Sequence, residues 1–232
     1  MIYFDGIDIR NIAKVKIEDI RVGGIEYSPV ARSRAITQGA LFVRNRAVSR
    51  TVSVTFALLE NDISNRQSSL MAINHWAKSD KEYELEVIGH PNQYLKAICT
   101  SKPEPSMRQW WESKLRLVFT CISDPYWIDK VPTSVSCGTA FTVLGDYEPV
   151  MQIERTLVED VSNQSYTMDG KTMTFSTIPS GDMLIDLNNQ TAEVDGSSIM
   201  EYYSPASKFL TPSLGTHTIT GIGTVKYRQR WA

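Results

Sequence analysis

Histidine, the side chain that most often carries acid–base chemistry, occurs three times in this chain. His75, His90 and His217 stand far apart, each at an expected turn or helix end, and none has a second ligand at metal-binding spacing. The chain has no Gly-x-Ser-x-Gly elbow, glycine-rich phosphate loop, Cys-x-x-Cys or His-Glu-x-x-His motif. The sequence therefore predicts no enzyme, no catalytic residue, no metal and no cofactor. A cell-wall hydrolase with a dispersed site stays as an alternative, which turnover of cell wall would test.

The cysteines and the carboxylates also give no indication of a catalytic site. Cys99, Cys121 and Cys137 are an odd number at wide spacing, two of them inside apolar segments, which is typical of buried free thiols in a reducing compartment. Residues 82–88 alternate acids with apolar side chains. Acids two apart on the outward face of a strand are usually solvated, so we interpret them as surface charges and not as paired catalytic carboxylates.

A run of arginines in residues 21–50 is the most unusual feature of the composition. These residues include six arginines, no lysine and one acid, Glu26. On an extended chain, residues two apart share a face, so Arg32 pairs with Arg34 and Arg44 with Arg46. Three interpretations stay open: a solvated hairpin whose charges prevent aggregation, an arm that binds a neighbouring subunit, and a nucleic-acid contact. The arm residues of interest are Arg32, Arg34, Phe42, Arg44 and Arg46.

The first half of the chain alternates strand patterns with one helix pattern. Strands are expected at residues 15–22, 51–59, 82–88, 94–100 and 115–122. A helix is expected at about 64–78, opened by a capping box of Ser64 and Gln67, with Ile63, Leu70, Ile73 and Ala77 at helical spacing. These elements predict a β-sandwich-like domain with one packed α-helix.

The second half has only short strand patterns, with turn signals about every ten residues. Strands are expected at 141–144, 150–153, 166–168, 173–175, 183–185 and 225–231. The pairs Asp169-Gly170 and Asp195-Gly196 predict tight hairpin turns, because both residues tolerate positive φ. Asn188-Asn189 marks a further turn. The half is predicted to be an all-β sandwich.

A proline-aromatic connector separates the halves. The junction residues are Asp124, Pro125, Tyr126 and Trp127, and Pro125 ends a strand because proline cannot donate to a ladder. The rings of Tyr126 and Trp127 are expected just outside the first core, where they would cover the seam between the domains. The domains are predicted as 1–129, with a hairpin arm at 21–50, and 130–232.

Charge is distributed unevenly along the 232 residues. Residues 1–124 hold 17 Lys and Arg against 14 Asp and Glu, whereas residues 125–232 hold 7 against 12. This asymmetry supports the division into two domains. No apolar run is long enough to span a bilayer, and the N-terminus lacks the basic and apolar regions of a secretory signal.

Several short motifs resemble the distal tail protein of long-tailed (siphovirus-type) bacteriophages. They are the strand that ends in Asp124-Pro-Tyr-Trp127, the pairs Ile185-Asp186 and Asp195-Gly196, and the closing Tyr227-Arg-Gln-Arg-Trp231. One segment departs from the family: Leu210-Thr-Pro-Ser-Leu-Gly-Thr-His217 stands where the family commonly has Leu-x-Pro-Gly-x-Asn. The alignment is therefore weakest at residues 211–217.

The resemblance implies a structural hub protein. In the family, the first domain forms a ring, expected to be hexameric, at the distal end of the tail tube, and its hairpin embraces the next subunit. The implied partners are other copies of the chain, the tail tube protein, and tail-tip or baseplate proteins, without a membrane and with DNA passing through the ring. The implied location is the virion tail, after synthesis in the bacterial cytoplasm.

The resemblance also implies that the second domain is a galectin-like jelly-roll sandwich. Fold alone does not give function, and no His, Asn, Arg and Trp set of a sugar site can be placed on one face. The sequence therefore predicts no lectin activity. The alternative function is a carbohydrate-binding or cell-surface adhesin carried by this sandwich.

Overall fold

A computed structural model of the chain describes residues 1–33, 40–102 and 114–232, and for residues 31–33 and 40–45 it describes the backbone only. The chain divides into two compact units, Met1–Trp127 with Ala232, and Ile128–Trp231, here unit 1 and unit 2. The predicted mainly β fold is confirmed, because one α-helix and two short 3-10 turns accompany the strands in the described residues. The two units are described separately below.

Unit 1 is built on a continuous set of antiparallel strand pairs in the order β3, β5, β8, β7, β6, β1, β2. One end of β7 pairs with β6 and the other end with β8, so β7 joins the two parts of the sheet. Its elements are β1 Ile2–Phe4, β2 Ile7–Asp8, the 3-10 turn η1 Ile9–Asn11, β3 Val15–Val22, β4 Glu26–Ser33, β5 Ala40–Leu58, α1 Ile63–Trp76, β6 Tyr83–Val87, β7 Gln93–Ser101 and β8 Leu115–Cys121, with β9 Trp127–Asp129 at the division.

Helix α1 begins earlier than the capping-box pattern predicted. Its N-cap is Asp62, whose carboxylate accepts a hydrogen bond from the Asn65 backbone N–H at 3.1 Å. The prediction of a Ser64 and Gln67 capping box is therefore wrong, because the carboxylate two residues earlier already accepts from an early helical N–H group. Ser64 lies inside the first turn.

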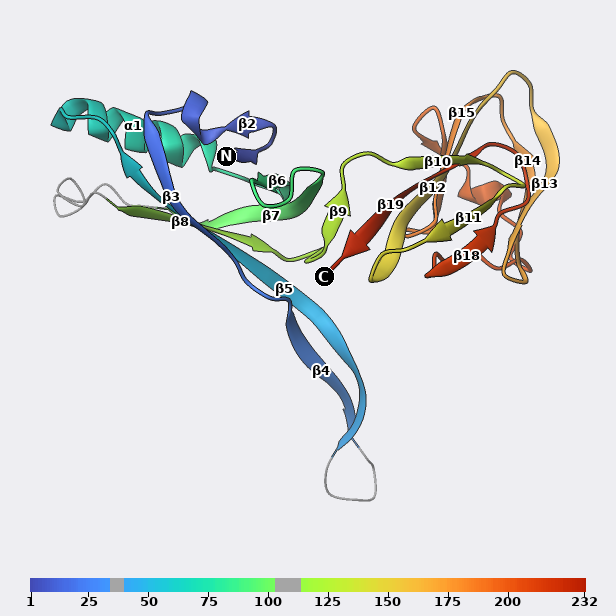
Figure 1. The fold of residues 1–232 in the computed structure, drawn as a ribbon. Helices are drawn as coiled ribbons and strands as arrows, with labels where there is room; N and C mark the ends of the chain where they lie inside the picture. The colour runs from blue at the N-terminus through green and yellow to red at the C-terminus, as the bar shows by residue number, and fades with distance from the viewer. Residues whose placement is uncertain (34–39, 103–113) are drawn as a thin grey trace. The chain divides into compact units, whose positions relative to one another are not determined.

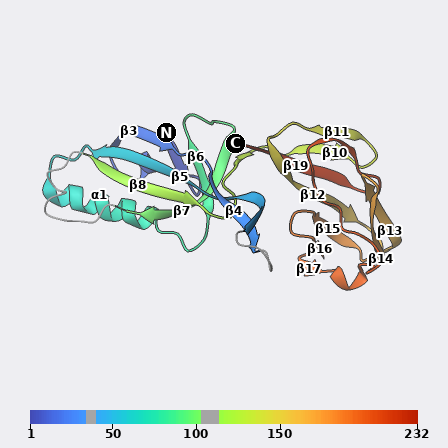
Figure 2. The ribbon, with the colours of Figure 1, turned by 90° about the horizontal axis from the view of Figure 1, so that it is seen from below.

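The buried side of α1 is narrow. Leu70, Ile73 and Ala77 are buried as predicted, whereas the side chain of Ile63 is 48% exposed. Figure 2 shows the helix lying alongside the strands of unit 1. At its C-terminal end Trp76 contacts Phe4 and Phe119 edge-on, with ring centroids 5.9 and 6.4 Å apart. These aromatic contacts tie the helix to strands β1 and β8.

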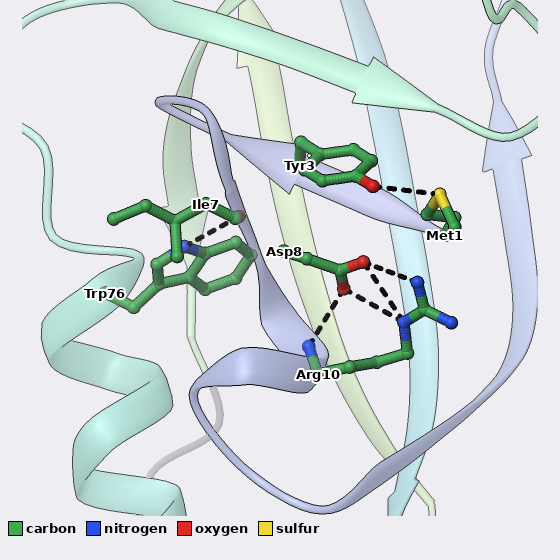
Figure 3. A network of polar contacts seen from close by, with 6 residues as sticks. All are labelled: Met1, Tyr3, Ile7, Asp8, Arg10 and Trp76. Atoms are coloured by element: carbon green, nitrogen blue, oxygen red, sulfur yellow. Dashed lines mark hydrogen bonds and ion pairs between the residues drawn. The ribbon is translucent and has the colours of Figure 1, made fainter.

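A polar network secures the N-terminal strands against the helix (Figure 3). The Trp76 indole N–H donates to the Ile7 carbonyl oxygen at 3.2 Å. The buried Asp8 carboxylate accepts from the Arg10 backbone N–H at 2.9 Å and from its guanidinium, with Nη2 2.6 Å from Oδ2. The hydrogen bonds from the Arg10 side chain hold the pKa of Asp8 below its usual value, although burial acts in the opposite direction.

Strand β5 is a single strand that belongs to two different structures. Its residues Arg50–Leu58 belong to the sheet: β8 pairs with Arg50–Phe56 and β3 with Val52–Leu58, and Val52, Val54 and Phe56 have no exposed surface. Its residues Ala40–Ser49 pair with β4 to form a two-stranded ribbon that projects from the sheet of unit 1 (Figure 1). We call this ribbon, residues 26–33 and 40–49, the arm.

Unit 2 contains only strands, one 3-10 turn and loops. One sheet has the order β10, β19, β12, β15, β16, β17, and the pairs β11–β18 and β13–β14 lie apart from it. The elements are β10 Thr133–Ser136, β11 Ala140–Val143, β12 Tyr147–Leu157, β13 Val161–Met168, β14 Lys171–Ile178, β15 Gly181–Asp186, β16 Thr191–Val194, β17 Ser197–Ser198, the 3-10 turn η2 Met200–Tyr202, β18 Gly215–Thr218 and β19 Thr224–Trp231. A single cluster of buried apolar side chains fills the space between the sheets, as in a β-sandwich.

The predicted turns of unit 2 are confirmed at backbone level. Asp169 and Gly170 have φ values of 50° and 75°, and Asp195 and Gly196 have 49° and 75°, the double positive φ of a type I′ hairpin turn. Residues 187–190, which include Asn188 and Asn189, also form a turn. Four short strands had no expectation from the sequence: β10, β16, β17 and β18.

Candidate functional site

The arm is the part of unit 1 that the core stabilises least. Its described side chains are largely exposed, with Tyr27 at 49% and Val48 at 42%. Among the described strands, β4 pairs only with β5, and strand β8 accompanies β5 no farther than Arg50. The outer edge of β4 and the opposite edge of β5 over Ala40–Ser49 therefore carry backbone groups without a strand partner.

The predicted arm residues are only partly described. Arg34 lies outside the described residues, and the side chains of Arg32, Phe42 and Arg44 are not described. The backbone register places Arg44 opposite Val30 and Arg46 opposite Ser28, without a bulge between them. Arg46 is exposed. The roles of these residues in assembly stay a prediction.

Arg21 and Arg50, the first and last of the six arginines, lie in the sheet of unit 1 and not in the arm. Arg50 is only 4% exposed, and its guanidinium carbon lies 5.9 Å from the centroid of the Trp127 ring. The expectation that the whole 21–50 segment is an arm is therefore wrong at both ends, because residues 21–22 belong to β3 and Arg50 pairs with β8. Arg50 is tolerated in its buried position because its planar cation lies over the aromatic ring of Trp127.

An open groove of about 690 Å³ lies at the base of the arm. One wall is the free edge of the arm strand β5 with the facing part of β4, and the other is the segment 122–126 that follows β8. Val48 and Ile122 present 42% and 55% of their surface there. The lining is mostly apolar, with one arginine: Ser28, Val30, Arg46, Ala47, Val48, Ile122, Ser123, Pro125 and Tyr126. Such a surface suits a protein partner.

A carboxylate fixes the second wall of this groove. Glu82 Oε1 accepts hydrogen bonds from the backbone N–H groups of Ile122 and Ser123 at 2.7 and 2.9 Å, and Oε2 accepts from the Ser123 hydroxyl. Burial alone would raise the pKa of Glu82, but the hydrogen bonds from Ser123 and Ile122 outweigh it and lower the pKa. The interpretation of this acid as a merely solvated surface charge is wrong, because its carboxylate accepts hydrogen bonds from the protein backbone. The sequence does not reveal these partners, which lie about 40 residues away.

The junction residues differ in burial. Asp124 is 6% exposed and Trp127 is 2% exposed, whereas Tyr126 is only partly buried. The Trp127 ring stacks on His90 with centroids 3.8 Å apart and an angle of 14° between the planes. Trp127 is therefore a buried residue that packs on unit 1 side chains. Its predicted role at a domain seam stays a prediction.

The cysteines of the chain are free and poorly suited to nucleophilic chemistry. Burial raises the pKa of the Cys121 thiol to about 12, and it also raises the pKa of Cys99 and Cys137. A thiol must ionise to attack or to bind a metal, so these residues are protonated at neutral pH. Within the ranges 1–33, 40–102 and 114–232 no group of three or more His, Cys, Asp and Glu side chains is placed to hold a metal ion.

A serine, a histidine and an aspartate line up in unit 2. His217 Nδ1 lies 2.8 Å from Asp169 Oδ2, and His217 Nε2 lies 3.4 Å from Ser213 Oγ. The Ser213 carbonyl oxygen is nearer to Nε2, at 3.1 Å, so the ring is placed to donate to the backbone and not to accept from the hydroxyl. We interpret the arrangement as an anchor that joins the loop before β18 to the β13–β14 turn.

The position of His217 corrects a prediction. The sequence placed it at a turn, but it lies within β18, opposite Phe141 of β11, and is 6% exposed. No nearby sequence signal could reveal this, because its carboxylate partner stands at another hairpin.

In the described part of the chain, no helix has the length and apolar character needed to cross a membrane.

No protein-family model and no curated protein sequence matches the chain. Solved structures do match. The Dit protein of phage SPP1, described as a paradigm of the hub adsorption apparatus in phages that infect Gram-positive bacteria, has a TM-score of 0.75 and 16% identity, over 100% of this chain and 98% of that one.

A second phage structure shares the fold. The baseplate of phage P2 in its activated conformation contains a chain with a TM-score of 0.56 and 9% identity with calcium, and 0.55 and 10% with strontium. These matches cover 97% of this chain and 93% and 92% of the others. The resemblance to distal tail proteins is therefore confirmed at the level of the fold, over both units.

Proposed function

We propose that the chain is a structural hub protein of a phage tail that assembles into a ring at the distal end of the tail tube. The proposal is supported by the shared fold with phage hub and baseplate chains over nearly the full length. It is independently supported by the arm, which is the single observation that carries it.

The arm needs a partner for physical reasons. A two-stranded ribbon is only marginally stable in water, and exposed strand edges pair readily with other chains unless something covers them. The described arm backbone has two such edges, and its base opens into the apolar groove beside Val48 and Ile122. A neighbouring copy that covers the arm would satisfy the free edges and bury the groove.

A ring follows if the arm binds a different surface of the next copy. Contacts between unlike surfaces make a closed ring when the rotation between copies closes, so the interface is used once per subunit. The family resemblance favours six subunits. The proposed partners are the tail tube protein on one side and tail-tip or baseplate proteins on the other. The proposed location is the virion tail, with DNA passing through the ring. We also propose that unit 2 is a galectin-like sandwich.

The test replaces Arg32, Arg34, Arg44 and Arg46 together with serine and measures mass by light scattering. The parent is expected to form a ring of about six times the 26.1 kDa chain mass, and the variant a folded monomer or small oligomer. Each arginine pair buried at an interface contributes on the order of 1–3 kcal/mol, repeated around the ring. Circular dichroism shows whether the variant folds.

A matched control removes the same charge from unit 1 away from the arm. The exposed residues Lys14, Lys16, Lys78 and Lys96 serve for this, and their serine variant is expected to keep the ring. A parent that stays monomeric at high concentration contradicts the hub function. A ring of unchanged mass from the arginine variant contradicts only the role of the arm, which would then be a solvated hairpin.

A further inference from the structure

Unit 2 carries a second groove, which is lined by none of the arm residues. Its volume is about 440 Å³, and it lies between the start of β14 and the loop at 204–208. Apart from a glycine and an alanine, its lining consists of lysines and hydroxyl-bearing residues: Lys171, Thr172, Thr174, Ser204, Ser207 and Lys208. No aromatic ring and no carboxylate is among the lining residues.

Two lysines, Lys171 and Lys208, supply the charge of this groove. Unit 2 has more acids than bases, and Lys226, for example, is engaged by Glu154. Within the residues that the structure describes, neither Lys171 nor Lys208 forms an ion pair. The acid nearest to Lys171 in sequence, Asp169, has its carboxylate beside His217. Two lysines without carboxylate partners leave positive potential over the groove.

The wall of the groove is rigidly built. Ser204 N–H donates to the Thr174 carbonyl oxygen at 2.9 Å, and Lys208 N–H donates to the Thr172 carbonyl oxygen at 2.9 Å. Ser207 Oγ accepts from the Thr174 N–H at 3.2 Å and donates to the Ser204 carbonyl oxygen at 2.7 Å. The loop that carries Lys208 is therefore fixed against β14 before any ligand binds, which reduces the entropy cost of binding.

The floor of the groove is a ladder of hydroxyl groups. Met173 and Phe175 are buried in the core, so the alternate residues Thr172 and Thr174 face outward. Their hydroxyls lie 3.1 and 2.9 Å from those of Thr167 and Ser165 across the hairpin. A hydroxyl is one donor with two acceptor positions, so each keeps capacity for a ligand after this contact.

We propose that this groove binds a phosphorylated polyol. Lysine ammonium groups bind phosphate oxygens as point charges, and the hydroxyl ladder matches the hydroxyl groups of a polyol chain. A neutral sugar ring would lack the aromatic face on which it stacks, so charge supplies the affinity and hydroxyl contacts supply selectivity. Because the lysines are exposed, the expected affinity is weak, with a Kd on the order of 1 mM, and falls with added salt.

The test titrates the full-length protein with glycerol 1-phosphate, inorganic phosphate and glycerol at low salt, followed by NMR chemical shifts. Glycerol 1-phosphate is expected to shift the amide signals of residues 171–174 and 204–208 and to bind more tightly than either fragment. The double variant K171Q/K208Q is expected to weaken this binding at least about tenfold, or about 1.4 kcal/mol.

A charge-matched control separates a site from general attraction. K130Q/K226Q removes two positive charges from the same unit outside the groove, and it is expected to leave the affinity within about twofold. Equal losses in both double variants, shifts spread over the surface, or no binding of glycerol 1-phosphate would each overturn the proposal. Equal affinity for inorganic phosphate would overturn the polyol part, because the hydroxyl ladder would then contribute nothing.

Discussion

The two halves of strand β5 have the same backbone structure and opposite surroundings. Over Val52–Phe56 the strand has neighbours on both edges, and Val52, Val54 and Phe56 are fully buried. Over Ala40–Ser49 its one neighbour among the described strands is β4, and the described Arg46 and Val48 are exposed. The inner half is held by the core of its own unit. The outer half keeps strand geometry without a core, which is expected of a segment that a partner completes.

The largest expected difference between the halves is in side-chain packing. Replacing Phe56 by alanine leaves a cavity in the core and should lower the free energy of unfolding by about 3–5 kcal/mol. Replacing Val48 by serine should change it by no more than about 0.5 kcal/mol, because the side chain is 42% exposed. Urea denaturation followed by circular dichroism measures both, at a concentration where the chain is monomeric. Similar costs for the two variants would remove the distinction between the halves.

Glu82 fixes the segment that follows β8, beside the point where the two halves of β5 meet. The variant E82Q should lower the free energy of unfolding by about 1–2 kcal/mol at pH 7. The neutral amide oxygen accepts more weakly from the N–H groups of Ile122 and Ser123, and the amide NH2 that replaces Oε2 cannot accept from the Ser123 hydroxyl. The exposed neighbour Glu84 is the matched control, and E84Q should have almost no effect.

The same variant has a predicted pH dependence. Since the folded-state pKa of Glu82 is lowered, its contribution is fully present above its usual value of 4.5 and is lost as the pH falls through the folded-state value. The parent and E82Q should therefore converge in stability below about pH 4.5. A constant difference between them down to pH 3 would show that the ionised carboxylate is not the stabilising species.

The smallest expected effect is that of R46S on the free energy of unfolding of the monomer. Arg46 is exposed, so R46S should leave the free energy of unfolding of the monomer within about 0.5 kcal/mol of the parent. The same change should lower the ring fraction at limiting protein concentration, measured by analytical ultracentrifugation. Loss of monomer stability in step with loss of rings would place Arg46 in the fold and not in the interface.

Local patterns predicted much of both units. Residues 15–22 form β3 with the predicted bounds, and the two Asp-Gly pairs adopt the predicted turns, because a two-residue turn depends mostly on its own residues. The pattern at 51–59 found the buried half of β5 but not its continuation. No turn residue separates the two halves, and only the tertiary structure decides where burial stops.

The candidate site was less predictable because its contacts join distant residues. Glu82 is 40 residues from Ile122, and Asp169 is 48 residues from His217 in sequence. Arg50 resembles the other arginines in composition, but Trp127 and the end of β8 bury it. The alternation along a strand predicts which face of the sheet a side chain occupies, but not which distant backbone group it contacts.

The continuity of β5 also has a mechanical consequence. A pull on the outer half is transmitted along one covalent strand into Arg50–Leu58, where ladders to β3 and β8 lie on either side of Val52–Phe56. Backbone hydrogen bonds of an antiparallel ladder run perpendicular to the strand, so such a force shears both rows at once and does not open them one by one. The arm is thus anchored to resist tension along its length, and its weak direction is the sideways peeling of β4 from β5.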